Sequence, residues 1–250
     1  MEIVSVERSY VRVAGPDAAD FLQRMLSNDA EGLSVGGSCA ALLLTPKGRV
    51  IAPLVLWRRG EDDFLLVTEP ELGDVVRAHL TRMRLRARCE VDAEQHRSTI
   101  VFGGGDGLVV PGLRAVEVLD AELEDTLSPG ELERRRIEAG VPRWGREIDD
   151  RILPAEAGLT ETHVSFTKGC YPGQEPIARL HYRGHPNRGL RVLAVEGAVA
   201  PDEELTYEGK VVGRVTSAAD GLALAYVRVE VPAEAELRAS AATLSAPPRP

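Results

Sequence analysis

The sequence predicts an α+β fold that ends in a small all-β module. Residues 39–102 hold several strand-like runs and one amphipathic helical stretch, an order typical of an antiparallel sheet covered by a helix. From residue 189 onward, strand-like runs alternate with glycines, as in a small β-barrel. A chain of 250 residues is long enough for one large domain or for two to three small ones.

The first two thirds of this pattern can be followed element by element. A strand is expected from Tyr10, and Pro16 and Asp17 then start a helix with an apolar stripe. Further strands are expected over 39–44, 49–57, 63–68, 86–93 and 98–102. Thr68 is expected to cap a helix that runs to about Arg82. Four alternating arginines are expected on a solvated strand face: Arg82, Arg84, Arg86 and Arg88.

The remaining elements have clear boundaries in the sequence. Ser128 and Glu131 are spaced as a capping box, so a helix should begin there and end near Gly140. Residues 143–172 are typical of a long ordered loop, of the kind that often carries binding residues. A short helix is expected over 176–183, and strands over 204–208, 210–217 and 221–229. The Ala-, Ser- and Pro-rich end, 236–250, is expected to be disordered.

Composition excludes several classes of protein. The net charge of −9 argues against broad, nonspecific binding of nucleic acid, which needs a positive surface. The three cysteines are far apart and form no C-x-x-C pair, so neither a zinc site nor a disulfide framework is indicated. No signal peptide or membrane span is apparent, and we expect a cytoplasmic protein without membrane contact.

The segment from Lys168 to Glu175 is the most informative part of the chain. It places Cys170 between a lysine and a tyrosine in a glycine-rich loop, and a nearby cation can favour the thiolate. The residues alone leave two interpretations open: a reactive thiol, or a buried and inert one. The signature residues are Lys168, Gly169, Cys170, Tyr171, Gly173, Gln174, Glu175 and, further on, Arg179.

This loop resembles the signature of the YgfZ family, folate-binding proteins linked to iron–sulfur cluster maintenance and related to the T-protein (aminomethyltransferase) of the glycine cleavage system. Other stretches resemble family blocks in the same order along the chain. They are Gly15-Pro16-Asp17-Ala18, Ser27-Asn28-Asp29, Arg136-Ile137-Glu138-Ala139-Gly140 and Leu153-Pro154-Ala155-Glu156.

The resemblance implies a three-lobed, T-protein-like architecture around a cavity that binds tetrahydrofolate or a one-carbon derivative. The folate-binding lobe would combine 1–40 with 120–187, an α+β lobe would be inserted at 41–119, and the barrel would span 188–235. It also implies that the folate site includes Tyr10, Asn28, Leu132, Arg136 and Glu138. Relatives can carry Trp or Arg near Leu132, which here offers apolar contact only.

The resemblance implies a role in assembling or repairing iron–sulfur enzymes, with an indirect effect on tRNA modification. In this interpretation Cys170, with Lys168 beside it, makes a transient bond or redox contact with a partner protein. The alternative is a folate-dependent aminomethyltransferase. T-proteins have an aspartate on the strand after a Gly-x-Val/Ile turn, whereas Ala52 and Pro53 stand there in this chain and cannot take a proton.

Overall fold

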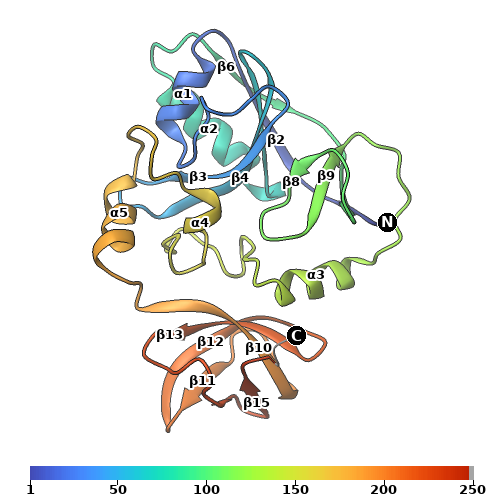
Figure 1. Cartoon of the computed structure of the whole chain (residues 1–250), viewed down its shortest axis with the longest axis vertical. Helices are drawn as coiled ribbons and strands as arrows, with labels where there is room; N and C mark the ends of the chain where they lie inside the picture. Colours follow the sequence, from blue (N-terminus) through green and yellow to red (C-terminus); the bar gives the residue numbers. More distant parts are fainter. Residues whose placement is uncertain (248–250) are drawn as a thin grey trace.

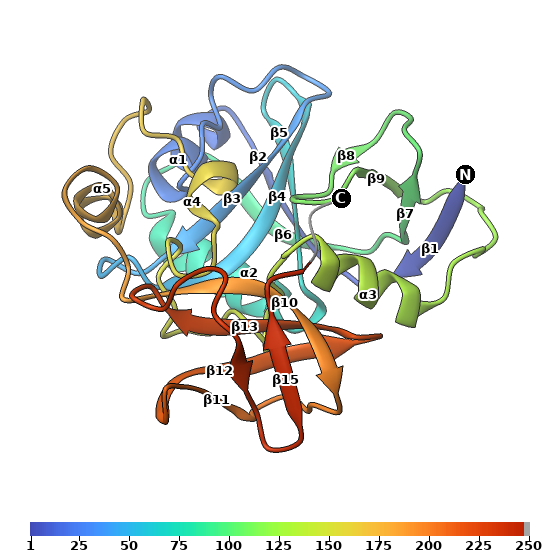
Figure 2. The same cartoon turned by 60° about the horizontal axis from the view of Figure 1, so that its bottom comes forward.

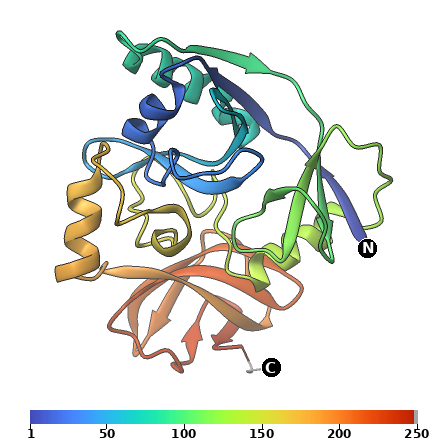
Figure 3. The same cartoon turned by 45° about the horizontal axis from the view of Figure 1, so that its top comes forward.

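The computed structural model describes residues 1–247. Two antiparallel sheets and a closed barrel are arranged around a common centre (Figures 1 and 3). The predicted α+β class with a C-terminal barrel is therefore confirmed. Within the described range, every helix is too short or too polar to cross a lipid bilayer.

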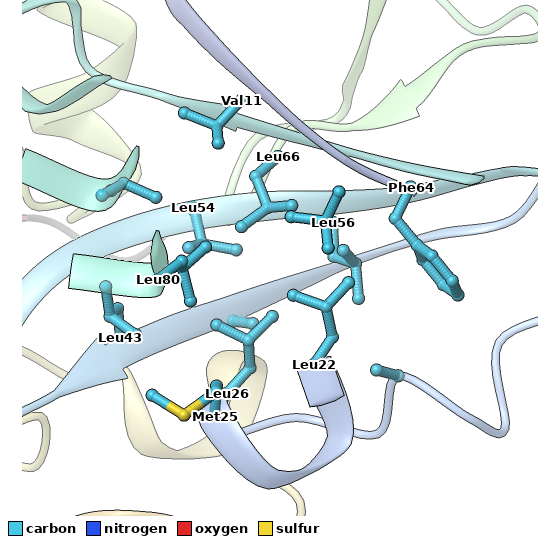
Figure 4. Close-up of a cluster of buried hydrophobic side chains, with 14 of the residues drawn as sticks. Val11, Leu22, Met25, Leu26, Leu43, Leu54, Leu56, Phe64, Leu66 and Leu80 are labelled. Atoms are coloured by element: carbon cyan, nitrogen blue, oxygen red, sulfur yellow. The ribbon is translucent and has the colours of Figure 1, made fainter. Parts of the chain in front are cut away.

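The larger sheet is covered on one face by two helices, α1 (Ala18–Met25) and α2 (Gly73–Met83). Its strand order is β3 (Ser38–Leu44), β4 (Val50–Gly60), β5 (Asp63–Thr68), β2 (Ser9–Ala14) and β6 (Glu90–Glu94). Leu22 projects from α1 toward Leu56 of the sheet, and Met25 of the same helix is buried in the same cluster (Figure 4). These side chains are spaced on one helix face, so burying them fixes α1 against the strands.

Two local predictions in this sheet were wrong. Thr68 ends β5 instead of capping a helix, because its hydroxyl donates a hydrogen bond to the carbonyl of Pro53 at 2.7 Å. A short 3-10 helix, η1 (Pro70–Leu72), then leads into α2. The strand expected from residue 86 begins only at Glu90, since residues 84–87 form a turn with Leu85 at φ 47°. The arginines of this region therefore do not share a strand face.

The smaller sheet packs against the central helix, α3 (Pro129–Glu138). Its strand order is β1 (Glu2–Val6), β7 (Ser98–Phe102), β9 (Ala115–Leu119) and β8 (Leu108–Val109). The predicted capping box of α3 is confirmed, with Ser128 and Glu131 each accepting a hydrogen bond from the other's backbone N–H.

Strand pairing crosses the expected lobe boundaries. β1 pairs with β7, and β2 pairs with β5, so both sheets combine residues from before position 40 with residues after it. The resemblance implies a lobe boundary at residue 40. In the structure, the chain passes from one hydrogen-bonded sheet to the other near residue 8 and again near residue 96. The division into lobes stays a prediction.

The barrel continues beyond the expected end of folded structure. Its order is β10 (Arg188–Gly197), β13 (Leu222–Arg228), β12 (Lys210–Ala219), β11 (Glu204–Tyr207), β14 (Leu237–Arg238) and β15 (Ala242–Ser245). The disorder predicted from residue 236 was wrong for β14 and β15, because Leu237 and Leu244 are buried in the barrel core. Residues 248–250 of the predicted tail lie outside the described residues.

One buried arginine ties α3 to the barrel. All five N–H groups of Arg136 are used: two hydrogen bonds go to Glu133, and one each to Glu147, the Val141 carbonyl and the Ser217 hydroxyl. Ser217 of β12 in turn donates to Glu147 at 2.7 Å. A guanidinium has no further donors, so this buried network is complete on the arginine side.

Removing the carboxylate of Glu147 should destabilise the protein more than any exposed acidic substitution on α3. Glu147→Ala leaves Arg136 buried without one of its two charge partners, a change that typically costs about 3 to 5 kcal/mol. Glu138→Ala is the matched control, since Glu138 is an exposed acidic residue on α3, the helix that carries Arg136. Urea denaturation should give a large loss for the first variant and a small one for the second. Equal losses would show that the network adds nothing.

Candidate ligand cavity and cysteine loop

A central cavity of about 910 Å³ lies where the two sheets, α3 and the segment 139–163 meet. Its walls are largely apolar, including Val55 and Val67 from the larger sheet, Leu113 after β8 and Leu132 of α3. Its size falls within the range of about 300–1,000 Å³ typical of small-molecule sites. The segment 139–173 contains one short helix, α4 (Thr160–His163), and leads to α5 (Gln174–Arg183).

Polar groups enter this apolar cavity at two places. At one, Arg8 lies 3.1 Å from Glu69 and 3.5 Å from Glu117, and all three side chains line the cavity. At the other, Arg143 and Arg146 line the wall near Glu133. Arg143 lies 3.3 Å from Glu133, whereas Arg146 is exposed and forms no ion pair with any described residue. The cavity therefore offers both carboxylates and cations to a ligand.

Tyr10 is not among the residues that line the cavity. It is buried, and its hydroxyl donates a hydrogen bond to Ser98 at 2.7 Å, which in turn donates to Glu117. Tyr10 thus supports the carboxylate of Glu117 from behind. This arrangement does not support the expected stacking of Tyr10 on a ligand in this cavity.

The central helix, α3, offers fewer groups to a ligand than the resemblance implies. Leu132 and Arg136 both border the cavity, but every donor of Arg136 is already engaged within the protein. Glu138 is exposed and does not line the cavity. Of these three residues, Leu132 is the one left free to contact a ligand. We correct the assignment of Arg136 accordingly to a structural role.

The two strand positions at which T-proteins would have an acidic side chain are apolar here and face different sides of the sheet. Pro53 lines the wall, and Ala52 is fully buried in the core of the larger sheet. Neither side chain can exchange a proton. The carboxylates that do line the cavity come from other strands and loops, among them Glu69 and Glu117.

His163 lines the cavity from the end of α4. Its side chain is 5 % exposed, and its Nδ1 lies 2.7 Å from the Thr162 hydroxyl. Burial lowers the pKa of His163 to about 4, so the imidazole is neutral near pH 7. A neutral imidazole in a cavity wall can accept or donate a hydrogen bond to a ligand.

Lys168 anchors the cysteine loop to the end of α1. Its ammonium donates three hydrogen bonds of 2.7 Å, to the carbonyls of Gln23, Leu26 and Asn28. An ammonium has three N–H groups, so none is left for the Cys170 sulfur. The charge also complements the negative end of a helix. These contacts give Lys168 a role in positioning the loop, and its expected effect on the thiol stays a prediction.

Side chains on both sides of Cys170 are fixed while Cys170 itself is exposed. Tyr171 is buried in the core below the loop, and its ring lies 5.4 Å from the Lys168 ammonium. Gly173 has φ 85°, and a Cβ there would come within 2.6 Å of the Thr45 carbonyl. The glycine is therefore required where the loop crosses the turn after β3. The loop presents one free thiol on an otherwise constrained backbone.

The other signature residues lie outside the cavity lining. The Asn28 side chain donates a hydrogen bond of 2.7 Å to the Ala40 carbonyl. The backbone carbonyl of Asn28 accepts a hydrogen bond from Lys168. Gln174 and Glu175 open α5, and Arg179 is exposed on that helix. Gly169 has open space around it. The structure brings Lys168 and Asn28 together, but neither they nor Arg179 border the cavity.

Sequence reasoning missed the polar residues of the cavity. Glu117 interrupts an apolar strand, AVEVL, and its side chain is only 3 % exposed. A single carboxylate at a buried position in such a run was the available signal. Arg8 and Arg146 carried no comparable signal, because they resemble other surface arginines in the sequence. In the range 1–247, no group of three His, Cys, Asp or Glu side chains has an arrangement suited to a metal ion.

The low pKa of His163 predicts a specific loss of stability in acid. Between pH 6.5 and about 4 the unfolded chain binds a proton at this residue and the folded protein does not. The unfolding free energy should thus fall as pH drops through this window, by up to about 3 kcal/mol from this residue. His163→Gln removes the titrating group. The difference in urea stability between wild type and variant should therefore change from pH 7 to pH 4.5; a constant difference would contradict the assignment.

Comparison with known proteins agrees with this architecture. The family profile of the GCVT N-terminal domain matches residues 6–133, just over half of the chain, and that of the CAF17 C-terminal β-barrel domain matches residues 187–249. The human mitochondrial iron–sulfur cluster assembly factor IBA57 is 27% identical, over 87% of this chain and 74% of that protein. An aminomethyltransferase of Bacillus cytotoxicus is 24% identical, over 91% and 80%.

A solved structure has the same fold. The glycine cleavage system aminomethyltransferase T of Bartonella henselae superposes with a TM-score of 0.84 at 21% identity, covering 98% of this chain and 84% of that one. At this identity the likeness concerns the fold alone. The chain therefore belongs to the GCVT-domain family and carries a CAF17-type C-terminal barrel, as its resemblance to the YgfZ-like proteins predicted.

Proposed function

We propose that this protein binds a tetrahydrofolate in its central cavity and assists the assembly or repair of iron–sulfur enzymes through Cys170. The observation that carries the proposal is the exposed thiol on a loop whose neighbouring side chains are fixed. Effects on tRNA modification would follow indirectly, through enzymes that need a cluster. The similarity to IBA57, whose name gives its role in cluster assembly, supports the same direction.

The residues of the cavity fit a folate. A pterin ring needs apolar walls, which Val55, Val67 and Leu132 supply, and its amino groups need acceptors such as the Glu117 carboxylate. The glutamyl carboxylates of a folate need cations, and Arg146 is an exposed, unpaired candidate within the described chain. When bound, the folate would supply one-carbon chemistry, while these residues would bind and orient it.

Aminomethyl transfer is the less supported function. The relatives include aminomethyltransferases, but Ala52 and Pro53 replace the acidic positions expected from T-proteins, and the one of them that reaches the cavity wall is Pro53. A wall without that group can hold the ligand but lacks a group to stabilise a developing ammonium. Robust tetrahydrofolate-dependent release of ammonia from aminomethylated H-protein would favour the transferase over the proposed role.

Calorimetric titration with tetrahydrofolate tests the ligand. Wild type should bind saturably, and Arg146→Glu should weaken binding by about tenfold because it replaces a charge-assisted contact with repulsion. Arg134→Glu is the control, since Arg134 is exposed on α3 and does not border the cavity. Absence of saturable binding to wild type would refute folate as the ligand. Equal binding by both variants would refute only the proposed contact between the ligand and Arg146.

Complementation of a strain that lacks the native gene tests the thiol. Cys170→Ser should lose support of cluster-dependent enzyme activity, because a thiolate is the required ligand or nucleophile. Cys39→Ser should retain it, since burial raises the pKa of the Cys39 thiol to about 11 and keeps it protonated. The Cys170 variant should still bind tetrahydrofolate. Full activity of that variant would refute a function for the exposed thiol.

A further inference from the structure

A second hollow, of about 830 Å³, lies between α1 and the turn 84–87, apart from the central cavity. We call it the α1 groove. Its apolar lining consists of Phe21, Met25, Met83, Leu85, Ala87 and Pro172. Phe21 and Met25 are nearly buried and form its floor, whereas Leu85 is 86 % exposed beside it. Met83, 38 % exposed, adjoins Leu85 in this lining, and an exposed apolar patch with a polar rim is typical of a protein-interaction site.

The backbone holds Leu85 in this exposed position. Leu85 has φ 47°, a left-handed conformation that is unfavourable for a leucine. The turn is closed by a hydrogen bond of 2.9 Å from the Ala87 N–H to the Arg84 carbonyl. Arg84 also donates to the Cys89 carbonyl, and Arg88 is held by Asp17 at 2.7 Å. Strained residues that are fixed in this way cluster at binding sites.

The rim of the α1 groove is positively charged. Arg24, Arg84 and Arg86 line it, and the one acidic residue of the lining, Asp17, is already paired with Arg88. Arg24 pairs with Asp20, but Arg86 forms no ion pair with any residue of the described chain. A basic rim stands out on a protein with a net charge of −9. It should attract acidic groups and orient them over the apolar floor.

We propose that the α1 groove binds an acidic segment of a partner protein, with an apolar side chain inserted beside Leu85 and carboxylates facing Arg84 and Arg86. A nucleic acid fits less well, because its phosphates would meet the arginines but leave the apolar floor unfilled, and the groove exposes no aromatic ring for base stacking. This inference does not depend on folate binding or on the chemistry of Cys170.

The position of the α1 groove has a consequence for the cysteine loop. Pro172 lines the groove and lies two residues from Cys170. The segment between α4 and α5, which carries both residues, runs beside α1 (Figures 1 and 2). A protein bound in the groove would therefore be held next to the exposed thiol. Docking and thiol contact would then be separate functions of adjacent surfaces.

Selection from a random peptide library against the full-length protein tests this proposal. Enriched peptides should combine acidic residues with at least one large apolar residue. A fluorescein-labelled enriched peptide should bind about tenfold more weakly to Leu85→Asp and to Arg86→Glu. Two exposed barrel positions supply matched controls, Val211→Asp and Arg238→Glu, which should bind as wild type does. Binding should also weaken as salt is raised.

Several outcomes would overturn the proposal. These are a failure to enrich any peptide, enrichment of basic peptides, and equal affinity of the enriched peptide for wild type and both groove variants. A single-stranded oligonucleotide that competes with the peptide and loses affinity in Leu85→Asp would assign the groove to nucleic acid instead. Both mutated positions are exposed, and thermal melting of each variant will establish that it is folded. Cys170→Ser should leave peptide binding unchanged, which separates this test from that of the proposed function.

Discussion

The buried ion pair between Arg136 and Glu147 is the interaction on which the arrangement of the molecule depends. The Glu147 carboxylate also accepts a hydrogen bond from the Ser217 hydroxyl of the barrel. The Glu147 carbonyl accepts a hydrogen bond of 2.8 Å from the Tyr226 hydroxyl. The central helix, the segment after it and the barrel are thus joined through one site. Buried charges are tolerable only when their partners are complete, so these three parts are held in one relative position. The shape of the cavity that they border therefore depends on this ion pair.

The cavity and the cysteine loop are separate sites that share a supporting segment. The segment 139–173 contributes to both: His163 lines the cavity wall, and Lys168 of the cysteine loop follows it by only a few positions. Ser27 donates to the carbonyl of His163, and Lys168 donates to carbonyls at the end of α1, so both contacts fix this segment to the last turn of α1 and the residues just after it. A ligand that changes the cavity wall would act on a segment that leads directly to the thiol.

Charge is distributed unevenly over these sites. The cavity combines carboxylates and arginines around apolar walls, which suits a ligand with a flat ring and a charged tail. The α1 groove has arginines around an apolar floor and one engaged acidic group. The same acidic chain therefore presents one site suited to a small molecule and another suited to an acidic protein segment.

Local sequence patterns determined the fold class and the capping box of α3, because each depends on residues close together in the chain. The sequence left open whether Cys170 is exposed or buried, and the structure decided that it is exposed. The resemblance of the cysteine loop and the other sequence blocks also indicated the family. Only the tertiary structure decided what Lys168 and Arg136 do, since their hydrogen-bond partners lie far along the chain or on another element. It also decided that β14 and β15 complete the barrel. Two short strands of ordinary composition gain their stability from the strands that they pair with, and a sequence pattern cannot record that contact.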